Sequence, residues 1–274
     1  MKVVVTGASG FLAGRVIRSL MNRGIQCVGV ARSALPNTLR VARYADSPTG
    51  DVLVHLAEES DRARAAERGS AYEKAATETL AALLAKEYSR IVYASSAALY
   101  GDQSPRPHRG DDAVFVTDTY TRIKRYAELA VLEGPGVVAR VANLYGPGMA
   151  NSNVVSTILR QIPGEGPVEV LDDAPVRDFL WADDAASAIA AMVTGQPYGL
   201  FNVGSGQGTS IRELAKTALS VAGEANRTIV GTKPSGRPSH LVLDVKSTTT
   251  SFSWRPRMAL DEGLRVLLAG KSAH

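Results

Sequence analysis

The segment Thr6-Gly7-Ala8-Ser9-Gly10-Phe11-Leu12-Ala13-Gly14 joins the apolar run Val3 to Val5 to a stretch with helical periodicity. A dinucleotide fingerprint requires this order of strand, glycine turn and helix. In such a turn Gly7 permits the sharp reversal, and Gly10 lets the backbone approach a pyrophosphate at the positive end of the helix. The segment therefore predicts a dinucleotide-binding turn at the start of an α/β domain.

Short β-branched runs alternate with helical patterns as far as about residue 145. This alternation predicts an α/β fold with a Rossmann-type, doubly wound parallel sheet. The predicted strands and helices include Phe11 to Met21, Val52 to Leu56, Tyr72 to Lys86, Ile91 to Ala94, Tyr120 to Leu132 and Val137 to Val141. Gly and Pro then become frequent and the elements become short. We therefore expect residues 1–145 to form an NAD(P)-binding Rossmann domain, with later segments returning to it, and residues 146–274 to form mainly a smaller C-terminal substrate-binding lobe.

Composition narrows the possible classes of protein. The 274 residues are 45% hydrophobic and 21% charged, so the chain can bury a large core. No apolar run approaches the roughly 20 residues that cross a bilayer, and no signal-peptide pattern precedes the first strand, so we expect a cytoplasmic protein without a membrane partner. The net charge is +4, but the basic residues are scattered along the sequence, so we expect no specific nucleic-acid partner. The single cysteine, Cys27, provides neither a disulfide framework nor a cysteine-rich metal site, and no metal is expected.

The end of the second predicted strand indicates which dinucleotide is bound. An Asp or Glu there would hold the ribose 2′-hydroxyl of NAD, whereas an Arg accommodates the 2′-phosphate of NADP. The chain has Val30-Ala31-Arg32-Ser33 at this place, and its first acidic residue is Asp46. We therefore expect NADP(H), contacted by Arg32 and Ser33. The alternative is NAD, with Arg32 lying over the adenine.

Three further residues predict hydride and proton transfer. Tyr120 and Lys124 are spaced to lie on the same face of a helix. Ser96 follows the predicted strand Ile91 to Ala94 and lies at the sheet edge where ligands bind. A phenol with a pKa near 10 must fall by about three units to act as a base at neutral pH, and a lysine and an oxidised nicotinamide can stabilise its anion. Ser96 would hold a substrate oxygen while Tyr120 exchanges its proton and hydride moves to or from the nicotinamide.

With these motifs, the chain resembles the extended short-chain dehydrogenase/reductases, also called the NAD-dependent epimerase/dehydratase family, along nearly its whole length. Besides the glycine turn and the Tyr120/Lys124 pair, the ordered matches are His55-Leu56-Ala57, Ser95 to Gly101, Arg140 to Pro147, Arg177-Asp178-Phe179, Phe201 to Gly204 and Trp254-Arg255-Pro256. The resemblance implies an NAD(P) cofactor and a nucleotide-diphosphate sugar as the substrate. It also implies a possible homodimer, formed by helices on one side of the sheet.

The resemblance implies roles for individual residues. Ser96, Tyr120 and Lys124 would be catalytic, Asn143 would seat the substrate together with Ser96, and Arg177 and Arg237 would meet its diphosphate. The cofactor would contact Gly7, Ser9, Gly10, Phe11, Leu12, Arg32, Ser33, Leu56, Ala57, Ala94, Tyr120 and Lys124. In the alternative interpretation, Arg177 only pairs with Asp183 or Asp184, and residues 236–238 form a plain loop.

Departures from the family pattern narrow the reaction. Sugar-nucleotide 4,6-dehydratases carry an Asp-Glu pair after the active Ser or Thr, whereas Ala97 and Ala98 follow Ser96 here. The epimerase-reductases that make fucose nucleotides use a nearby cysteine, and Cys27 is far away in the sequence.

The predicted function is C4 epimerisation of a nucleotide sugar through a transient 4-keto intermediate. The alternative is an NADPH-dependent nucleotide 4-keto-sugar reductase. A non-catalytic dinucleotide-binding sensor is less favoured, because such a sensor usually lacks the Tyr or the Lys, and both are present here.

The chain is also short for the family. Little sequence lies between Arg32 and Asp51 to build the usual crossover helix.

Overall fold

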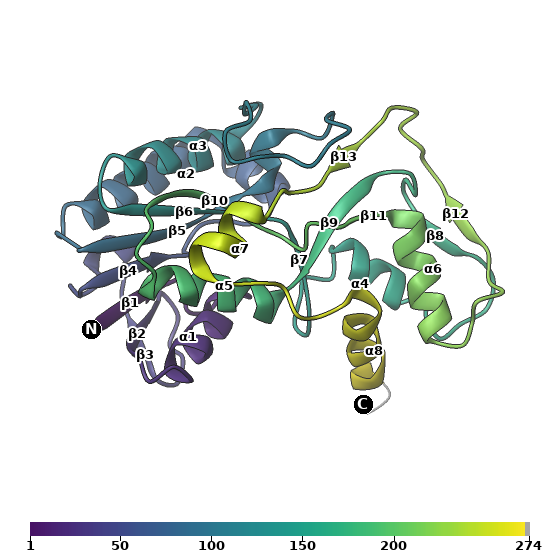
Figure 1. Cartoon of the computed structure of the whole chain (residues 1–274), viewed down its shortest axis with the longest axis horizontal. Coiled ribbons are helices and arrows are strands. Elements are labelled where there is room, and N and C mark those ends of the chain that lie inside the picture. Colours follow the sequence, from purple (N-terminus) through teal and green to yellow (C-terminus); the bar gives the residue numbers. More distant parts are fainter. Residues whose placement is uncertain (272–274) are drawn as a thin grey trace.

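A sheet of seven parallel strands forms the centre of the larger part of the molecule in the computed structural model, which describes residues 1–271 (Figure 1). In spatial order its strands are β10 (Gly199–Val203), β6 (Gly136–Val141), β5 (Arg90–Ser96), β4 (Val52–His55), β1 (Lys2–Thr6), β2 (Gln26–Ala31) and β3 (Thr38–Arg40). The predicted Rossmann-type α/β fold is confirmed.

Helices cover both faces of this sheet (Figure 1). One layer contains α1 (Ala13–Met21) and α5 (Ala182–Thr194), and the other contains α2 (Arg62–Leu84) and α3 (Thr119–Leu132). Side chains of a strand alternate between faces, so the valines of β1 enter different cores. Val3 and Val5 pack in the same cluster as Ile189 of α5, while Val4 packs with Leu80 of α2. Strands covered on both sides are apolar throughout for this reason.

The connection from β2 to β4 contains no full helix. β3 follows β2 after residues 32–37, and the 3₁₀ turn η1 (Tyr44–Asp46) precedes β4. The expected lack of a crossover helix between Arg32 and Asp51 is therefore confirmed. Within this connection, Tyr44 of η1 packs close to Arg32.

The boundaries of two helices differ from the prediction. α2 begins at Arg62 rather than Tyr72, because Asp61 caps it by accepting hydrogen bonds from the amides of Ala63 and Arg64. Gly69, with φ of +54°, interrupts its first turns, and the many charged residues there weaken the apolar periodicity. α1 begins at Ala13 rather than Phe11, so more of the glycine turn is loop.

The later part of the chain builds a smaller lobe beside the sheet, on the right of Figure 1. Its core contains Trp181, Leu214 and Leu264. Its elements are β7 (Asn143–Tyr145), α4 (Val154–Leu159), β8 (Val168–Val170), β9 (Val176–Trp181), β11 (Gly208–Ser210), α6 (Ile211–Val221), β12 (Ile229–Gly231), β13 (His240–Leu241) and α8 (Leu260–Lys271). Three later segments return to the large sheet, namely α5, β10 and α7 (Lys246–Phe252). Within residues 1–271 there is no helix long and apolar enough to cross a membrane.

Candidate active site

The glycine turn forms one wall of a cleft at the carboxyl ends of β1 and β4. Gly7 has φ of +79°, and a Cβ at this position would lie 2.7 Å from the carbonyl oxygen of Leu56, so a side chain does not fit. The amide of Gly10 donates to the carbonyl of Gly7 at 2.7 Å, which closes the turn. No side chain caps the start of α1, and the first N–H groups of a helix have no partner inside it. The turn thus presents amide donors and the positive end of a helix to an anionic group.

The cleft gathers many of the residues predicted to hold a cofactor. The predicted residues that line it are Gly7, Ser9, Gly10, Arg32, Leu56 and Ala57. The prediction missed other lining residues, which come from η1, from the segment after β4 and from α2: Tyr44, His55, Glu58, Glu59, Arg68, Tyr72, Ala75, Ala76 and Thr79. The other predicted cofactor residues do not line this cleft, namely Phe11, Leu12, Ser33, Ala94, Tyr120 and Lys124. The Phe11 ring instead packs against Arg15, whose Cζ lies 4.4 Å from the ring centroid.

The residues of the cleft fit a dinucleotide. A glycine turn that excludes any Cβ lies at one end, and the guanidinium groups of Arg32 and Arg68 lie among the other lining residues. Each guanidinium also lies over a tyrosine ring, Arg32 at 5.4 Å from the Tyr44 centroid and Arg68 at 4.0 Å from that of Tyr72. Small side chains of α2 complete the wall. The position of Arg68 in the cleft could not be predicted from the sequence, because it depends on α2 beginning earlier than the apolar pattern indicates.

Tyr120 and Lys124 lie one turn apart on the buried face of α3. The helix begins with a capping box in which Asp118 accepts from the amide of Thr121 at 2.8 Å. Lys124 Nζ donates to the carbonyl oxygen of Ala94 at 2.8 Å and lies 5.7 Å from the Tyr120 ring centroid. The end of β5 therefore holds the ammonium group beside the phenol, as their spacing predicted.

Ser96 is the last residue of β5, two residues beyond Ala94. Its Oγ accepts a hydrogen bond from the amide of Ala98 at 3.2 Å, which begins the 3₁₀ turn η2 (Ala97–Tyr100). The neighbouring Ala97 is buried, and neither it nor Ala98 provides a carboxyl group. The predicted triad of Ser96, Tyr120 and Lys124 thus comes from the end of one strand and the adjoining helix.

Lys124 has a carboxylate partner that the sequence analysis did not identify. Glu58 Oε2 lies 2.9 Å from Lys124 Nζ and accepts a hydrogen bond from the Tyr93 hydroxyl at 2.6 Å. Burial opposes ionisation of Glu58, but the Lys124 charge and the hydrogen bonds outweigh it and lower its pKa. Burial likewise opposes the charge on Lys124, but Glu58 outweighs it and raises the pKa of Lys124. Both groups are therefore charged at neutral pH.

A second buried carboxylate, Glu128, joins the helix of Tyr120 and Lys124 to the sheet. Glu128 of α3 accepts two hydrogen bonds of 2.7 Å from Arg140 of β6, and Ser95 of β5 donates to it at 2.7 Å. A bidentate pair of this kind fixes geometry as well as charge. Glu128 thus ties α3 to the two strands next to it and keeps Tyr120 in register with the end of β5.

The two predicted diphosphate ligands converge on one carboxylate. Asp102, which follows η2, accepts from Arg237 at 2.9 and 3.1 Å and from the Ser239 hydroxyl at 2.5 Å. Arg177 Nη2 donates to Ser239 Oγ at 2.7 Å and lies 3.5 Å from Asp102 Oδ2. The alternative pairing of Arg177 with Asp183 or Asp184 is wrong. Asp183 instead pairs with Arg15 and Arg18, and Asp184 accepts from the amides of Arg257 and Met258.

Asn143 begins β7 and is exposed. Its Nδ2 lies 3.4 Å from the carbonyl oxygen of Asp178 on the neighbouring β9. Asp178 is itself buried, and its carboxylate accepts from the amides of Ser205, Gly206 and Leu243. Asn143 therefore stands at a joint between the sheet and the smaller lobe, with its amide accessible to a ligand.

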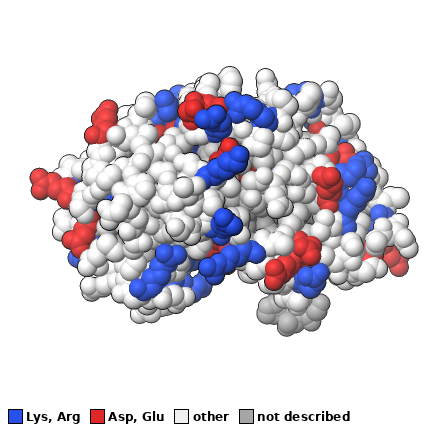
Figure 2. Space-filling view, in the orientation of Figure 1, with Lys and Arg blue, Asp and Glu red and all other residues white. Residues whose placement is uncertain are grey.

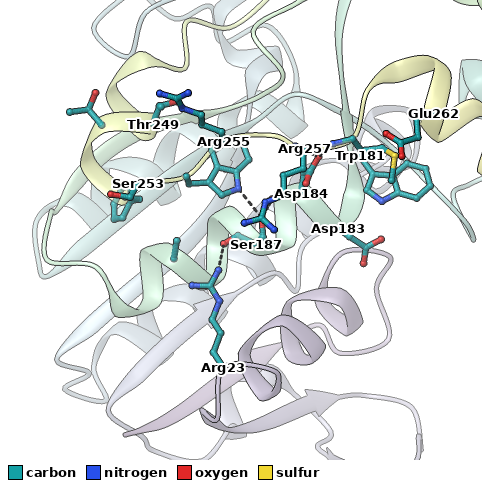
Figure 3. A pocket seen from close by; sticks show the side chains of 15 residues that line it. Arg23, Trp181, Asp183, Asp184, Ser187, Thr249, Ser253, Arg255, Arg257 and Glu262 are labelled. Carbon is teal, nitrogen blue, oxygen red and sulfur yellow. Dashed lines mark hydrogen bonds between the residues drawn. The ribbon is translucent and has the colours of Figure 1, made fainter.

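A larger cavity, of about 1080 Å³, lies elsewhere, between α5 and residues 249–258. Figure 3 shows Arg23 reaching from the end of α1 toward Ser187 of α5, whose carbonyl oxygen it binds at 3.2 Å. Trp254 Nε1 donates to the Ser187 hydroxyl at 2.8 Å. No residue predicted for the site lines this cavity.

Charged side chains are widely distributed on the face shown in Figure 2. Lys and Arg are scattered there over both parts of the molecule, and many lie beside Asp or Glu. Across residues 1–271, no group of three or more His, Cys, Asp or Glu side chains is arranged to hold a metal ion.

Comparison with known proteins places these features in a family. The model of the NAD dependent epimerase/dehydratase family matches residues 3–204. A dTDP-L-rhamnose 4-epimerase of Burkholderia thailandensis is 30% identical over 48% of this chain and 39% of its own length. A dTDP-4-dehydro-6-deoxyglucose reductase of Escherichia coli is 24% identical over 65% of this chain and 60% of its own length. The structure of UDP-glucose 4-epimerase from Thermotoga maritima, with UDP-glucose, superposes with a TM-score of 0.86, 21% identity and full coverage of both chains. The chain therefore belongs to the NAD dependent epimerase/dehydratase family.

Proposed function

We propose that this chain is an NAD(P)-dependent nucleotide-sugar 4-epimerase. The observation that carries the proposal is the position of Lys124 Nζ, 2.8 Å from the Ala94 carbonyl and beside Tyr120. This pair lies at the end of the sheet where the glycine-turn cleft also opens, so a sugar carbon, a phenol and a nicotinamide can meet there. Family membership and the epimerase relatives support the same chemistry.

The side chains divide the reaction between them. The bound dinucleotide supplies hydride acceptance and donation. Tyr120 Oη takes the proton of the sugar hydroxyl as a ketone forms, and returns it when the ketone is reduced. Ser96 Oγ holds the same oxygen, and the charge on Lys124 stabilises the phenolate. Because Ala97 and Ala98 provide no acid next to Ser96, elimination of water is not favoured, and hydride and proton transfer at one carbon is the chemistry left.

The smaller lobe provides the binding groups for the substrate. Arg177 and Arg237 lie together around Asp102, and paired guanidinium groups bind phosphates well. Asn143 lies at the joint between the lobe and the sheet. A nucleoside diphosphate held by the two arginines would leave its sugar directed to Ser96 and Tyr120.

A second candidate is an NADPH-dependent 4-keto-sugar reductase, and one observation favours it. The cleft contains Arg32 and Arg68, and the end of β2 has no carboxylate to repel a 2′-phosphate. NADPH is the usual donor for reductive biosynthesis, and a reductase is among the relatives. Dissociation constants of NADP and NAD test this point, since tighter binding of NAD would remove the argument.

Incubation with UDP-, dTDP- and GDP-linked sugars tests the function. Nicotinamide absorbance is followed for hexoses and for 4-keto sugars, and product stereochemistry is determined by NMR. Inversion at C4 without net cofactor change would establish the epimerase, and net consumption of NADPH by a 4-keto sugar would establish the reductase. If neither occurs with any of the sugars, both candidates are wrong.

A further inference from the structure

Glu58 is a cleft residue that the proposed chemistry does not use. It follows His55-Leu56-Ala57 at the end of β4, and its side chain is only 6% exposed. The same cleft is lined by Gly7 and Gly10 of the glycine turn. A buried carboxylate is costly unless it is paired. Its partner here is Lys124, with Oε2 at 2.9 Å from Nζ.

The surroundings of Glu58 do not explain it as a purely structural group. Its Oε2 also accepts from Tyr93, but its Oε1 is buried and has no hydrogen-bond partner among the described residues. His55 Nε2 lies 3.8 Å from this oxygen. Burial lowers the pKa of His55, so the imidazole is neutral at pH 7 and adds no compensating charge. Packing alone therefore does not account for this carboxylate, because apolar side chains would fill the same space without the cost of burying a charge.

We propose that Glu58 is a positioning residue for the Tyr120/Lys124 pair, acting through Lys124. Its carboxylate keeps the ammonium of Lys124 charged in a buried place and holds Nζ between the ends of β4 and β5. The consequence for turnover depends on the proposed function. The ion pair itself does not depend on it.

The charges around Lys124 determine the sign of the effect. The titratable groups that face it are Glu58 after β4, Tyr93 of β5, Tyr72 of α2 and Tyr120 of α3. His55 lies behind Glu58 and is neutral. Glu58 is thus the carboxylate among these groups. Without its negative charge, the effect of burial on the pKa of Lys124 would dominate. Burial lowers the pKa of a lysine, so removing the negative charge should lower the pKa of Lys124. A neutral lysine would no longer stabilise a phenolate.

The direct test is an NMR titration of the protein labelled with ¹³C at lysine Cε. The Lys124 signal is assigned with Lys124→Arg and followed against pH in the parent and in Glu58→Gln, without any sugar. We expect the titration midpoint of Lys124 to fall by at least about one pH unit in Glu58→Gln. Glu78→Gln is the matched control, because Glu78 pairs with Lys74 at the exposed surface of α2, and should leave the midpoint unchanged. An unchanged midpoint in Glu58→Gln would overturn the proposal.

Two further measurements separate positioning from stability. In the pH profile of kcat/KM, the alkaline limb should move to lower pH in Glu58→Gln, whereas a structural role would lower Tm and leave that limb in place. If the parent turns over no nucleotide sugar, the proposed function fails but the titration still decides the role of Glu58. If Glu58→Gln does not fold, Glu58→Asp keeps the charge and shortens its reach. That variant should give a smaller fall of the midpoint, and no fall would contradict the proposal.

Discussion

Two carboxylates, Glu58 and Asp102, each pair with a cationic side chain of the proposed active site. Glu58 lies inside the cleft, and Asp102 lies near the surface. In the first pair the side chains of Glu58 and Lys124 are 6% and 9% exposed, and in the second those of Asp102 and Arg237 are 22% and 55% exposed. Charges taken out of water must stay paired, because breaking the pair leaves one charge without solvation. An ion pair open to solvent is worth little and can exchange partners.

The difference in burial implies different tasks. The buried pair suits a permanent part of the reacting centre, where Lys124 must keep one place and one charge. The exposed pair suits a site that exchanges a carboxylate for a phosphate. Under the proposed function, Asp102 would hold Arg177 and Arg237 together until a diphosphate replaced it. Four predictions test this contrast.

The largest effect is expected at the buried site, from Tyr120→Phe. Loss of the hydroxyl removes the group that exchanges the proton, and turnover should fall by about 10²- to 10⁴-fold. Binding of the dinucleotide, followed by fluorescence of the reduced form, should remain close to that of the parent. Full activity of the variant would remove Tyr120 from the mechanism.

Lys124→Met should cost stability as well as activity. It leaves the Glu58 carboxylate buried without its partner, so the free energy of unfolding should fall by about 3–5 kcal/mol at neutral pH. The double variant Glu58→Gln/Lys124→Met carries neither charge and should recover much of this loss. Urea denaturation measures both. If the double variant is no more stable than Lys124→Met, the pair is not the origin of the loss.

Arg237→Ala should affect substrate binding while leaving the fold intact. Loss of a charge-assisted hydrogen bond to the diphosphate should raise KM for the nucleotide sugar by roughly 10-fold or more, with kcat little changed. The free energy of unfolding should stay close to that of the parent, since the pair with Asp102 is open to solvent. Lys216→Ala on α6 removes an exposed charge elsewhere and serves as the control. Equal KM values for the two variants would exclude Arg237 from the diphosphate site.

The smallest effect is expected from Asp102→Asn. Burial opposes ionisation of Asp102, but hydrogen bonds from Arg237 and Ser239 outweigh it and lower its pKa. The contribution of Asp102 to stability is therefore present above the unfolded pKa of about 3.9 and is lost as the pH falls through the folded pKa. That contribution should be below about 1 kcal/mol. UDP should bind the variant more tightly, because the competing carboxylate is gone. Calorimetry measures this, and weaker binding would mean that Asp102 positions the arginines instead.

Helix boundaries show where sequence reasoning succeeds and where it fails. Tyr120 and Lys124 lie on the same face of α3, as their spacing predicted, and the structure shows that this face is buried. The first ten residues of α2 were missed, because charged residues hide their periodicity and the helix forms through the Asp61 cap and contacts with α3. Arg68, which lies in that stretch, was missed with them. Tertiary contacts override local propensity in such segments.

The sequence alone determined the parallel sheet, the glycine turn and the Tyr120/Lys124 pair, because each depends on spacing over a few residues, which local backbone geometry converts into position. Only the tertiary structure decided which charges meet. Glu58 pairs with Lys124, and Asp102 joins Arg177 to Arg237, although all these partners are far apart along the chain. The order of the strands brings each set of partners together. Burial adds a further requirement at Glu58 and Lys124, because an enclosed charge is costly without an opposite charge beside it.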